Sequence, residues 1–307
     1  MLIKRLAAAF TLVSMSLFAQ TPSDVAKAAH LANINTLLIF TSQEGLNSGH
    51  YNFSNVGVRM DLYHLPFIYH FHSDTKLNSF VVGNVGYSRV YLNEDIEIPD
   101  GVRLDYDNHL RTYTAGLGGG LRYKLIPTLS ILGGVEFIYS TSGVSIKKPK
   151  GHIGDVIEDF FNKNYNQNIS YKFFTSLEYR QEIEGYKPYA IVNYKIYDTK
   201  STFTFDTLSK IQTQSSITTL SLGVESPKLM EFSQNYLTLE GYYHANFLSG
   251  SVKDVVKFGE FNALGSVLYY YTPDKPWWAS RFFFELNAVK ASGLDGYNVG
   301  VGFTVDF

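Results

Sequence analysis

Cysteine is absent from the 307 residues of this sequence. Its absence excludes a disulfide framework, thiol catalysis and the acylated cysteine that anchors lipoproteins. Long apolar runs are missing after residue 20, so no later segment approaches the roughly 20 residues that a membrane-spanning helix requires. Charge of one sign is not in excess either. The formal net charge is only −2, which gives no argument for nucleic acid as a partner.

The one apolar run of note stands at the start of the chain. Lys4 and Arg5 precede an apolar segment that extends from Leu6 to Phe18, and Ala19 supplies a small residue after it. This order predicts a secretory signal peptide over residues 1–19 that is cleaved after Ala19. A membrane anchor is the alternative, but the run is too short to span a bilayer.

Aromatic residues and glycine are plentiful, with 23 Tyr, 23 Phe and 25 Gly. Such a composition suits a sheet with one apolar and one wet face. The end of the chain shows this directly, because apolar side chains alternate with small or polar ones as far as Phe307. A period of two predicts a β-strand between two different solvents. One face holds Tyr297, Val299, Val301, Phe303, Val305 and Phe307, and the other holds Asn298, Gly300, Gly302, Thr304 and Asp306.

The same alternation recurs upstream. Short connections rich in Pro or Gly alternate along the chain with longer polar ones, and outer-membrane barrels show this asymmetry between periplasmic turns and external loops. We therefore predict an all-β fold, a transmembrane antiparallel β-barrel whose closure pairs every backbone group in lipid. A soluble β-sandwich is the alternative, but it does not need so regular a loop asymmetry. The alternating segments are 110–125, 129–140, 171–180, 236–247 and 278–290, with weaker ones at 79–91, 187–198, 215–225 and 259–271.

The strand count depends on how residues 51–72 are interpreted. Their apolar positions change phase at Leu65-Pro66, which indicates a bulge or a break. With a bulge, Ile34–Ser42 is the first strand and Gln43–His50 its loop. With a break, 51–62 and 65–72 form the first hairpin. Both routes predict about 12 strands, and parity alone also allows 10.

The segment before the barrel has a different composition. We assign residues 20–33 to an N-terminal helix or tail and residues 34–307 to the barrel. Ser23 or Asp24 can cap a helix here, and the alanines that follow favour it. A short helix inside the lumen and a frayed periplasmic tail are both open.

Charged residues gather on the rows that face away from the apolar side. Mixed signs in a narrow lumen predict a salt-bridged, largely plugged interior rather than a wide aqueous channel. Stabilising pairs are the first interpretation, selectivity for ions or solutes the second and catalysis the third. The inward residues are Arg122, Glu136, Glu178, Arg180, Glu240, Arg281 and Glu285, together with Arg59, Asp61 and Lys195.

Signals for catalysis or metal binding are weak. His70 and His72 share a face, but the spacing fixes no third ligand, so we expect neither a metal nor a cofactor. His109 and His244 are the candidate bases for an alternative function, an outer-membrane hydrolase that acts on lipid or peptide. The glycines of 116–120 lie in an alternating strand with no helix after it, so they predict curvature or close packing and not a phosphate loop.

Two features point to the membrane surface. Trp277, Trp278 and several tyrosines suit the interfacial aromatic belts of a membrane protein. The longest loop, 144–167, carries Lys147, Lys148 and Lys150. It is either a solvated lid or a contact for lipopolysaccharide phosphates or an external partner.

Taken with these residues, the chain resembles the autotransporter translocator β-barrel, in a solitary form in which only about thirty residues separate the signal peptide from the barrel if the first strand begins at residue 51. The resemblance implies a monomer in the outer membrane of a Gram-negative cell, in contact with its lipid and lipopolysaccharide. It also implies that the barrel-assembly machinery reads the final strand. That assembly signal consists of Tyr297, Val301, Phe303, Val305 and Phe307. The expected function is structural, weakly pore-forming or translocator-like, and not enzymatic.

Overall fold

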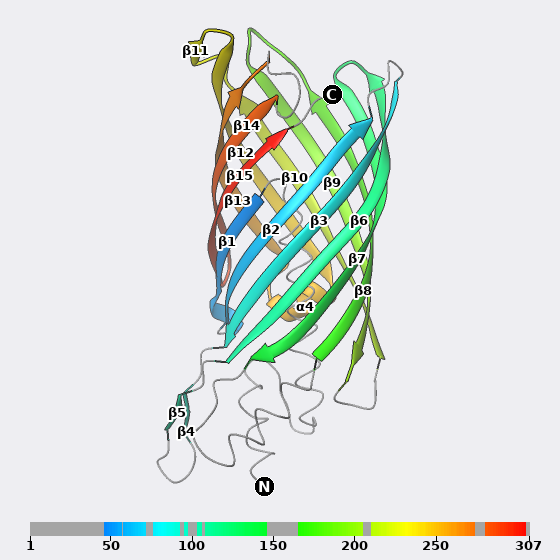
Figure 1. Ribbon diagram of the computed structural model, residues 1–307, viewed down its shortest axis with the longest axis vertical. Coiled ribbons are helices and arrows are strands. Elements are labelled where there is room, and N and C mark those ends of the chain that lie inside the picture. Colours follow the sequence, from blue (N-terminus) through cyan, green and yellow to red (C-terminus); the bar gives the residue numbers. More distant parts are fainter. Residues whose placement is uncertain are drawn as a thin grey trace.

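A computed structural model shows a single closed β-barrel (Figure 1). It describes residues 46–56, 58–71, 76–92, 95–97, 103–105, 108–145, 165–204, 210–273 and 280–304. The main sheet has thirteen strands, all antiparallel. One of them, β11, has three residues and pairs only with β12, so the remaining twelve form the barrel wall. The predicted fold class and the count of twelve are confirmed.

The elements follow one another as a meander. The barrel strands are β1 (Leu46–Phe53), β2 (Val58–Phe71), β3 (Leu77–Leu92), β6 (Asn108–Ile126), β7 (Leu129–Ser145), β8 (Tyr165–Arg180), β9 (Lys187–Phe203), β10 (Lys210–Glu225), β12 (Asn235–Gly250), β13 (Glu260–Tyr271), β14 (Arg281–Ala291) and β15 (Leu294–Thr304). The elements that are not part of the wall are η2 (Ser54–Val56), the small pair β4 (Asp95–Glu97) and β5 (Arg103–Asp105), β11 (Met230–Phe232) and the helix α4 (Ser251–Val256).

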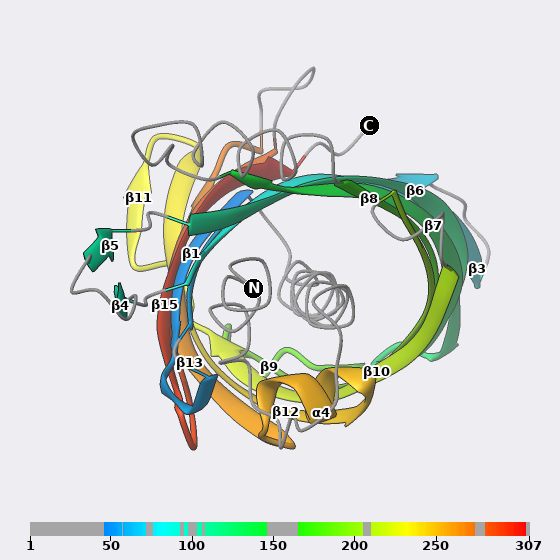
Figure 2. The same cartoon turned by 90° about the horizontal axis from the view of Figure 1, so that it is seen from below.

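The first and last strands close the barrel. β1 pairs with β2 on one edge and with β15 on the other, where Leu46 faces Val301 and Phe53 faces Leu294. β10 pairs directly with β12, so β11 is a side hairpin rather than part of the ring. The ring is visible along the axis in Figure 2. The described part of the terminal stretch that alternates in the sequence is therefore the strand that closes the ring.

Most wall strands have an apolar outer face and an inner face of smaller or polar residues, whereas the outward residues Ser48, His50 and Asn52 of β1 are polar. On β6, Tyr113, Leu117 and Leu121 are exposed on the outside, whereas Thr112 and Thr114 are buried inside. Outward aromatics also mark both ends of the band, since Tyr113 and Tyr123 stand at its two limits on this strand. Ten residues of a tilted strand cover roughly 25 Å, the height of the apolar band of outer-membrane barrels.

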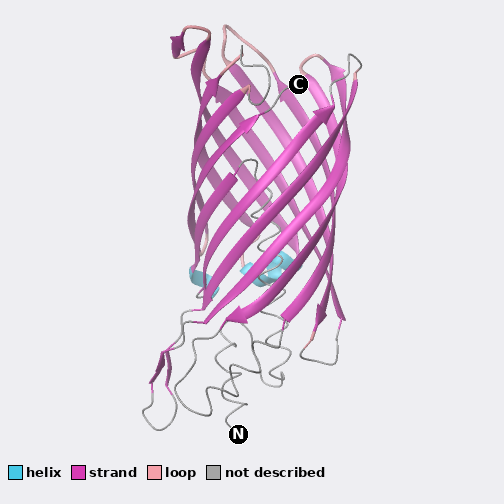
Figure 3. Ribbon diagram, in the orientation of Figure 1, coloured by secondary structure: helices cyan, strands magenta, loops and turns pink. Residues whose placement is uncertain are grey.

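The inside of the barrel is apolar at one end. A cluster of buried residues comes from strands around the ring, from α4 and from Phe258. Figures 1 and 3 show α4 at the end of the barrel where β3 ends and β6 begins, which we call the long-loop end. Val252 and Val256 anchor α4 in the cluster, and the rings of Phe53 and Phe258 stack with 6.3 Å between their centroids. We call this set, with Tyr51, Met60, Leu62 and Leu110, the apolar layer.

The apolar layer explains the change of apolar phase within residues 51–72. β2 runs without a bulge from Val58 to Phe71, in continuous register with β3. Met60 and Leu62 point inward into the apolar layer, while Leu65 and Phe67 point outward. The apparent change of phase is thus a change in what fills the lumen. Both predicted routes are wrong, because the first described strand is 46–53 and the hairpin turn lies at 54–57.

Two of the predicted inward charges change sides for the same reason. Met60 and Leu62 are buried, so their neighbours Arg59 and Asp61 lie on the outer face of β2. The assignment of Arg59 and Asp61 to the lumen is therefore wrong.

Several predictions fall outside the described residues. These are the signal peptide 1–19, the helix or tail 20–33, the strand 34–42, Trp277 and Trp278, and most of the loop 144–167. In the described part of the chain, no helix is both long and apolar enough to cross a membrane.

Candidate functional site: the inner wall of the barrel

Small residues on β6 and β7 make space for large side chains inside the barrel. A Cβ atom at Gly120 would run into the Phe80 ring, and one at Gly134 would meet the Phe174 ring at 2.5 Å. The two rings lie over these glycines from β3 and β8, with 6.1 Å between their centroids. The glycine run therefore serves close packing within a strand, as its alternation predicts.

The same inner wall carries a cluster of charges on β6, β7 and β8, which we call the β6–β8 cluster. Arg122 donates to Glu178, and Arg180 lies 3.8 Å from the same carboxylate. Lys172 donates to Glu136 at 2.7 Å, and Asn84 of β3 donates to its other oxygen. Glu136 is almost fully buried. A buried carboxylate is tolerated only when it is paired and hydrogen-bonded, and both conditions hold here.

A second cluster, the β9–β14 cluster, surrounds two glutamates with tyrosine hydroxyls. Glu240 accepts hydrogen bonds from Tyr189 at 2.6 Å and Tyr269 at 2.8 Å. Glu225 accepts from Thr238 at 2.7 Å and from Tyr271 at 2.9 Å, and Lys187 lies 3.3 Å away. Arg281 lies over the rings of Tyr269 and Tyr271. Fixed hydroxyls replace water around these carboxylates, so the cluster holds together without a matching cation for each acid.

Polar side chains also join the inner wall across the seam of the barrel, and we call this set the seam chain. Tyr242 donates to Glu285, and Asn287 donates to Tyr242 at 3.0 Å. Asn298 donates to Asn287 at 2.8 Å, and Tyr51 donates to Asn298. The hydrogen bonds therefore connect β12, β14, β15 and β1, which lie side by side in the ring except for the intervening β13.

The structure places the predicted lumen charges as follows. It brings Arg122, Glu178 and Arg180 together, and it pairs Glu136 with Lys172. The β9–β14 cluster and the seam chain take up the rest. Apart from Arg59 and Asp61, all the predicted lumen charges lie on inner positions of their strands. They are Arg122, Glu136, Glu178, Arg180, Lys195, Glu240, Arg281 and Glu285.

The histidines are distributed over both faces. His64 is buried on the inner side of β2, and His244 stacks on the Tyr242 ring with 4.4 Å between centroids. His109 lies 3.3 Å from the Arg89 guanidinium on the outer side of β6. His70 packs near Phe80, and His72 falls outside the described residues. Among the residues described, no group of three or more His, Asp or Glu side chains could hold a metal ion.

Sequence reasoning missed two contributions. The first is the set of tyrosine hydroxyls in the β9–β14 cluster, because only the register of four strands brings them to Glu225 and Glu240. The second is a pair on the outer face, where His50 Nδ1 lies 2.7 Å from Asp61 Oδ1. The correct phase of β2 was the signal that would have revealed it, because His50 and Asp61 are direct partners in the ladder.

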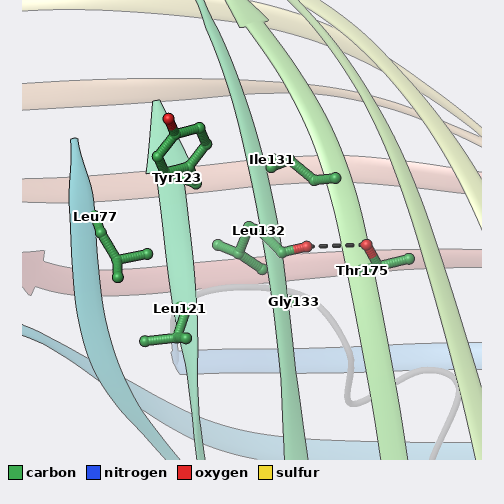
Figure 4. Close-up of a pocket in the computed structure, with 7 residues that line it drawn as sticks. All are labelled: Leu77, Leu121, Tyr123, Ile131, Leu132, Gly133 and Thr175. Atoms are coloured by element: carbon green, nitrogen blue, oxygen red, sulfur yellow. Dashed lines mark hydrogen bonds between the residues drawn. The ribbon is translucent and has the colours of Figure 1, made fainter. Parts of the chain in front are cut away.

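A groove of about 390 Å³ lies on the outer surface near the short-turn end, opposite the long-loop end (Figure 4). Its walls are mainly leucine, isoleucine and tyrosine side chains, and Gly133 leaves its floor open. The hydroxyl of Thr175 donates to the Leu132 carbonyl at 3.0 Å. The lining is apolar, and its one side-chain hydroxyl is already bonded to the backbone, so the groove presents no catalytic or metal-binding group. Its lining is Leu77, Leu121, Tyr123, Ile131, Leu132, Gly133 and Thr175.

Comparison with known proteins rests on structure alone. No protein-family model and no curated protein sequence matches the chain. The beta domain of the Bordetella autotransporter BrkA is 8% identical, with a TM-score of 0.53, and the match covers 84% of this chain and 96% of that one. The translocator domain of the autotransporter NalP from Neisseria meningitidis is 9% identical, with a TM-score of 0.54, and the match covers 92% and 96%. The chain thus has the fold of an autotransporter translocator barrel.

Proposed function

We propose that the chain is an integral outer-membrane β-barrel of a Gram-negative cell, inserted as a monomer and structural or weakly pore-forming in role. The observation that carries the proposal is the outer face of the closed ring. Phe67, Leu117, Leu264 and Phe303 are each more than half exposed, and similar side chains surround the barrel. Soluble monomers rarely expose contiguous apolar patches beyond a few hundred Å². Lipid is the solvent that such a face fits.

The lumen supports a largely closed barrel rather than an open channel. At the long-loop end the apolar layer gathers side chains from around the ring, with α4 among them. Farther along the axis, the β6–β8 cluster and the β9–β14 cluster hold charged side chains in ion pairs and hydrogen bonds. Side chains that are already paired leave few groups to coordinate a passing solute. We therefore propose that the barrel has a small single-channel conductance or none that can be measured.

A hydrolase built on His109 or His244 is less well supported. A general base acquires positive charge, which a neighbouring cation opposes. His109 contacts Arg89, and His244 contacts the Tyr242 ring. The contacts described for the two histidines thus favour packing roles. We propose a non-enzymatic barrel.

Biogenesis and surroundings follow from the same proposal. Tyr297, Val301 and Phe303 share the outer face of the closing strand, where an assembly factor could read them together. We propose that the barrel-assembly machinery recognises this face, together with Val305 and Phe307. The exposed band then contacts membrane lipid, with lipopolysaccharide at the long-loop end.

Gel migration tests the barrel itself. A folded β-barrel in detergent stays compact without boiling and runs differently after boiling. The full chain, extracted from membranes, is expected to show this shift and to fractionate with the outer membrane. Identical migration of boiled and unboiled samples would remove the proposal. Conductance in planar bilayers then tests the lumen, and a steady, large single-channel conductance would contradict the closed interior.

A further inference from the structure

Two arginines face each other on the outer surface of the barrel. Arg89 of β3 and Arg111 of β6 are direct partners in the ladder, and both occupy outward positions. Side chains at such positions start about 4.5–5.5 Å apart at their Cβ atoms, and like charges there destabilise a sheet. The pair lies near the long-loop end, because β3 ends and β6 begins there.

Among the described residues, no ion pair joins either arginine to a carboxylate. Asp61 is the ladder partner of Arg89, but its carboxylate is bonded to His50. Arg89 lies instead over the Tyr91 ring, at 4.8 Å, and beside His109. The Nε atoms of Arg89 and Arg111 are buried, and neither has a hydrogen-bond partner. Buried polar groups of this kind are normally satisfied, so these two Nε atoms lack an acceptor.

Space for an acceptor exists beside Arg111. Its ladder partner on β7 is Gly143, and a Cβ atom built on Gly143 would meet nothing within 4 Å. The outer face is therefore open on that side of the guanidinium. Two positive groups with an open space next to them suit a compact anion with several oxygens.

The neighbouring row of side chains fixes where this anion lies. The adjacent outward row, two residues farther from the loops, consists of Tyr63, Tyr87 and Tyr113. The ring centroids of Tyr63 and Tyr87 are 6.1 Å apart, and those of Tyr87 and Tyr113 are 5.1 Å apart. Tyrosine rings of a membrane barrel mark the level of the lipid headgroups. Arg89 and Arg111 thus lie just beyond the apolar band, at the depth of the phosphates.

We propose that Arg89 and Arg111 bind the phosphate monoester of a membrane lipid headgroup, with Gly143 leaving room for it and Tyr87 and Tyr113 flanking its acyl chains. Guanidinium groups bind phosphate oxygens in a bidentate way, and a monoester carries more charge than a diester. This inference rests on the proposed insertion of the barrel into the outer membrane.

The test measures lipid retained by the full-length mature protein in dodecyl maltoside micelles by native mass spectrometry. Phosphatidic acid is the phosphomonoester probe, and phosphatidylcholine is the reference lipid. The wild type is expected to retain phosphatidic acid preferentially. The R89Q/R111Q variant is expected to bind it about tenfold more weakly, the equivalent of one charge-assisted hydrogen bond.

A matched variant controls for general charge. Lys200 and Lys290 also lie on outward positions near the long-loop end, and K200Q/K290Q removes the same formal charge. This variant is expected to bind phosphatidic acid like the wild type. Equal losses in both double variants, or equal retention of phosphatidylcholine, would overturn the site. Displacement of the lipid by equimolar inorganic phosphate would show that the site takes free phosphate and would overturn the lipid assignment.

A second variant leaves both arginines in place. Gly143→Glu puts a carboxylate in the open space beside Arg111, so it is expected to compete with the phosphate while the barrel still folds. Wild-type lipid retention by a folded G143E protein would contradict the proposal. Heat-modifiable migration of each sample separates the two levels: loss of the shift in the wild type removes the barrel proposal, and a shifted wild type without lipid preference removes only the site.

Discussion

Tyr51 of β1 donates a hydrogen bond to Asn298 of β15, although 247 positions separate them in the chain. Both side chains are buried inside the barrel, and Asn298 in turn donates to Asn287 of β14. The bond crosses the seam between the first and last strands. Closure of the ring thus depends on polar side chains as well as on the backbone ladder.

Removing the seam hydroxyl is expected to loosen this closure. Tyr51→Phe keeps the ring in the apolar layer but leaves the Asn298 carbonyl oxygen without its donor. An unsatisfied buried polar group costs about 1–3 kcal/mol. The free energy of unfolding, measured by urea titration of the protein in lipid vesicles, is expected to fall by that amount. Tyr297→Phe is the control, because Tyr297 is on the outer face of the same seam and is exposed. Equal effects of the two substitutions would show that the seam bond contributes nothing specific.

The end of the chain makes a separate prediction about assembly. Tyr297, Val301 and Phe303 share an outer face in the structure, and Val305 and Phe307, outside the described residues, continue the same period. Deleting Phe307 is expected to lower the yield of heat-modifiable protein in outer-membrane fractions, while protein refolded in detergent keeps its stability. Unchanged membrane yield would count against the assembly signal.

The fold could be predicted because alternation is a local property of each strand. Strands such as 171–180 and 236–247 show an apolar and a polar face in their own residues. Short turns rich in Pro or Gly are likewise local signals, so strand limits can be predicted without knowing the rest of the fold. Strand 58–71 could not be predicted in the same way. Its inner face is apolar at Met60 and Leu62 because other strands and α4 bring apolar side chains to the same place in the lumen. A residue pattern read for one strand cannot reveal that.

The candidate site divides along the same line. Arg122, Glu178 and Glu240 were predicted to face inward because each stands opposite an apolar neighbour in its own strand. Their partners could not be predicted, since they depend on the register between strands. Glu240 meets Tyr189 across the intervening β10. Similarly, Arg89 and Arg111 become a pair only once β3 and β6 are aligned.

The ion pair of Arg122 and Glu178 provides a test of the β6–β8 cluster. Arg122→Gln leaves the mostly buried Glu178 carboxylate with the more distant Arg180 and the Ser176 hydroxyl, so it is expected to destabilise the barrel by about 3 kcal/mol, as for other broken internal pairs. The double variant R122Q/E178Q removes both charges and is expected to lose less than Arg122→Gln alone. Urea titrations of wild type, both single variants and the double variant form the cycle. Additive losses would mean that the two residues do not interact.

The apolar layer is expected to decide how much current the barrel passes. Phe258 stacks on Phe53 within the apolar layer, so Phe258→Ala removes a ring from the layer and leaves a cavity. Such a truncation costs about 3–5 kcal/mol, and it removes one ring from an apolar barrier of the kind that excludes water and ions by dewetting. Single-channel conductance in planar bilayers is expected to rise above that of the wild type. Phe247→Ala is the matched control, because this ring is exposed on the outer face of β12 and its loss leaves the lumen unchanged. If both variants conduct like the wild type while folding normally, the apolar layer is not the barrier, and the charged clusters farther along the axis must provide it.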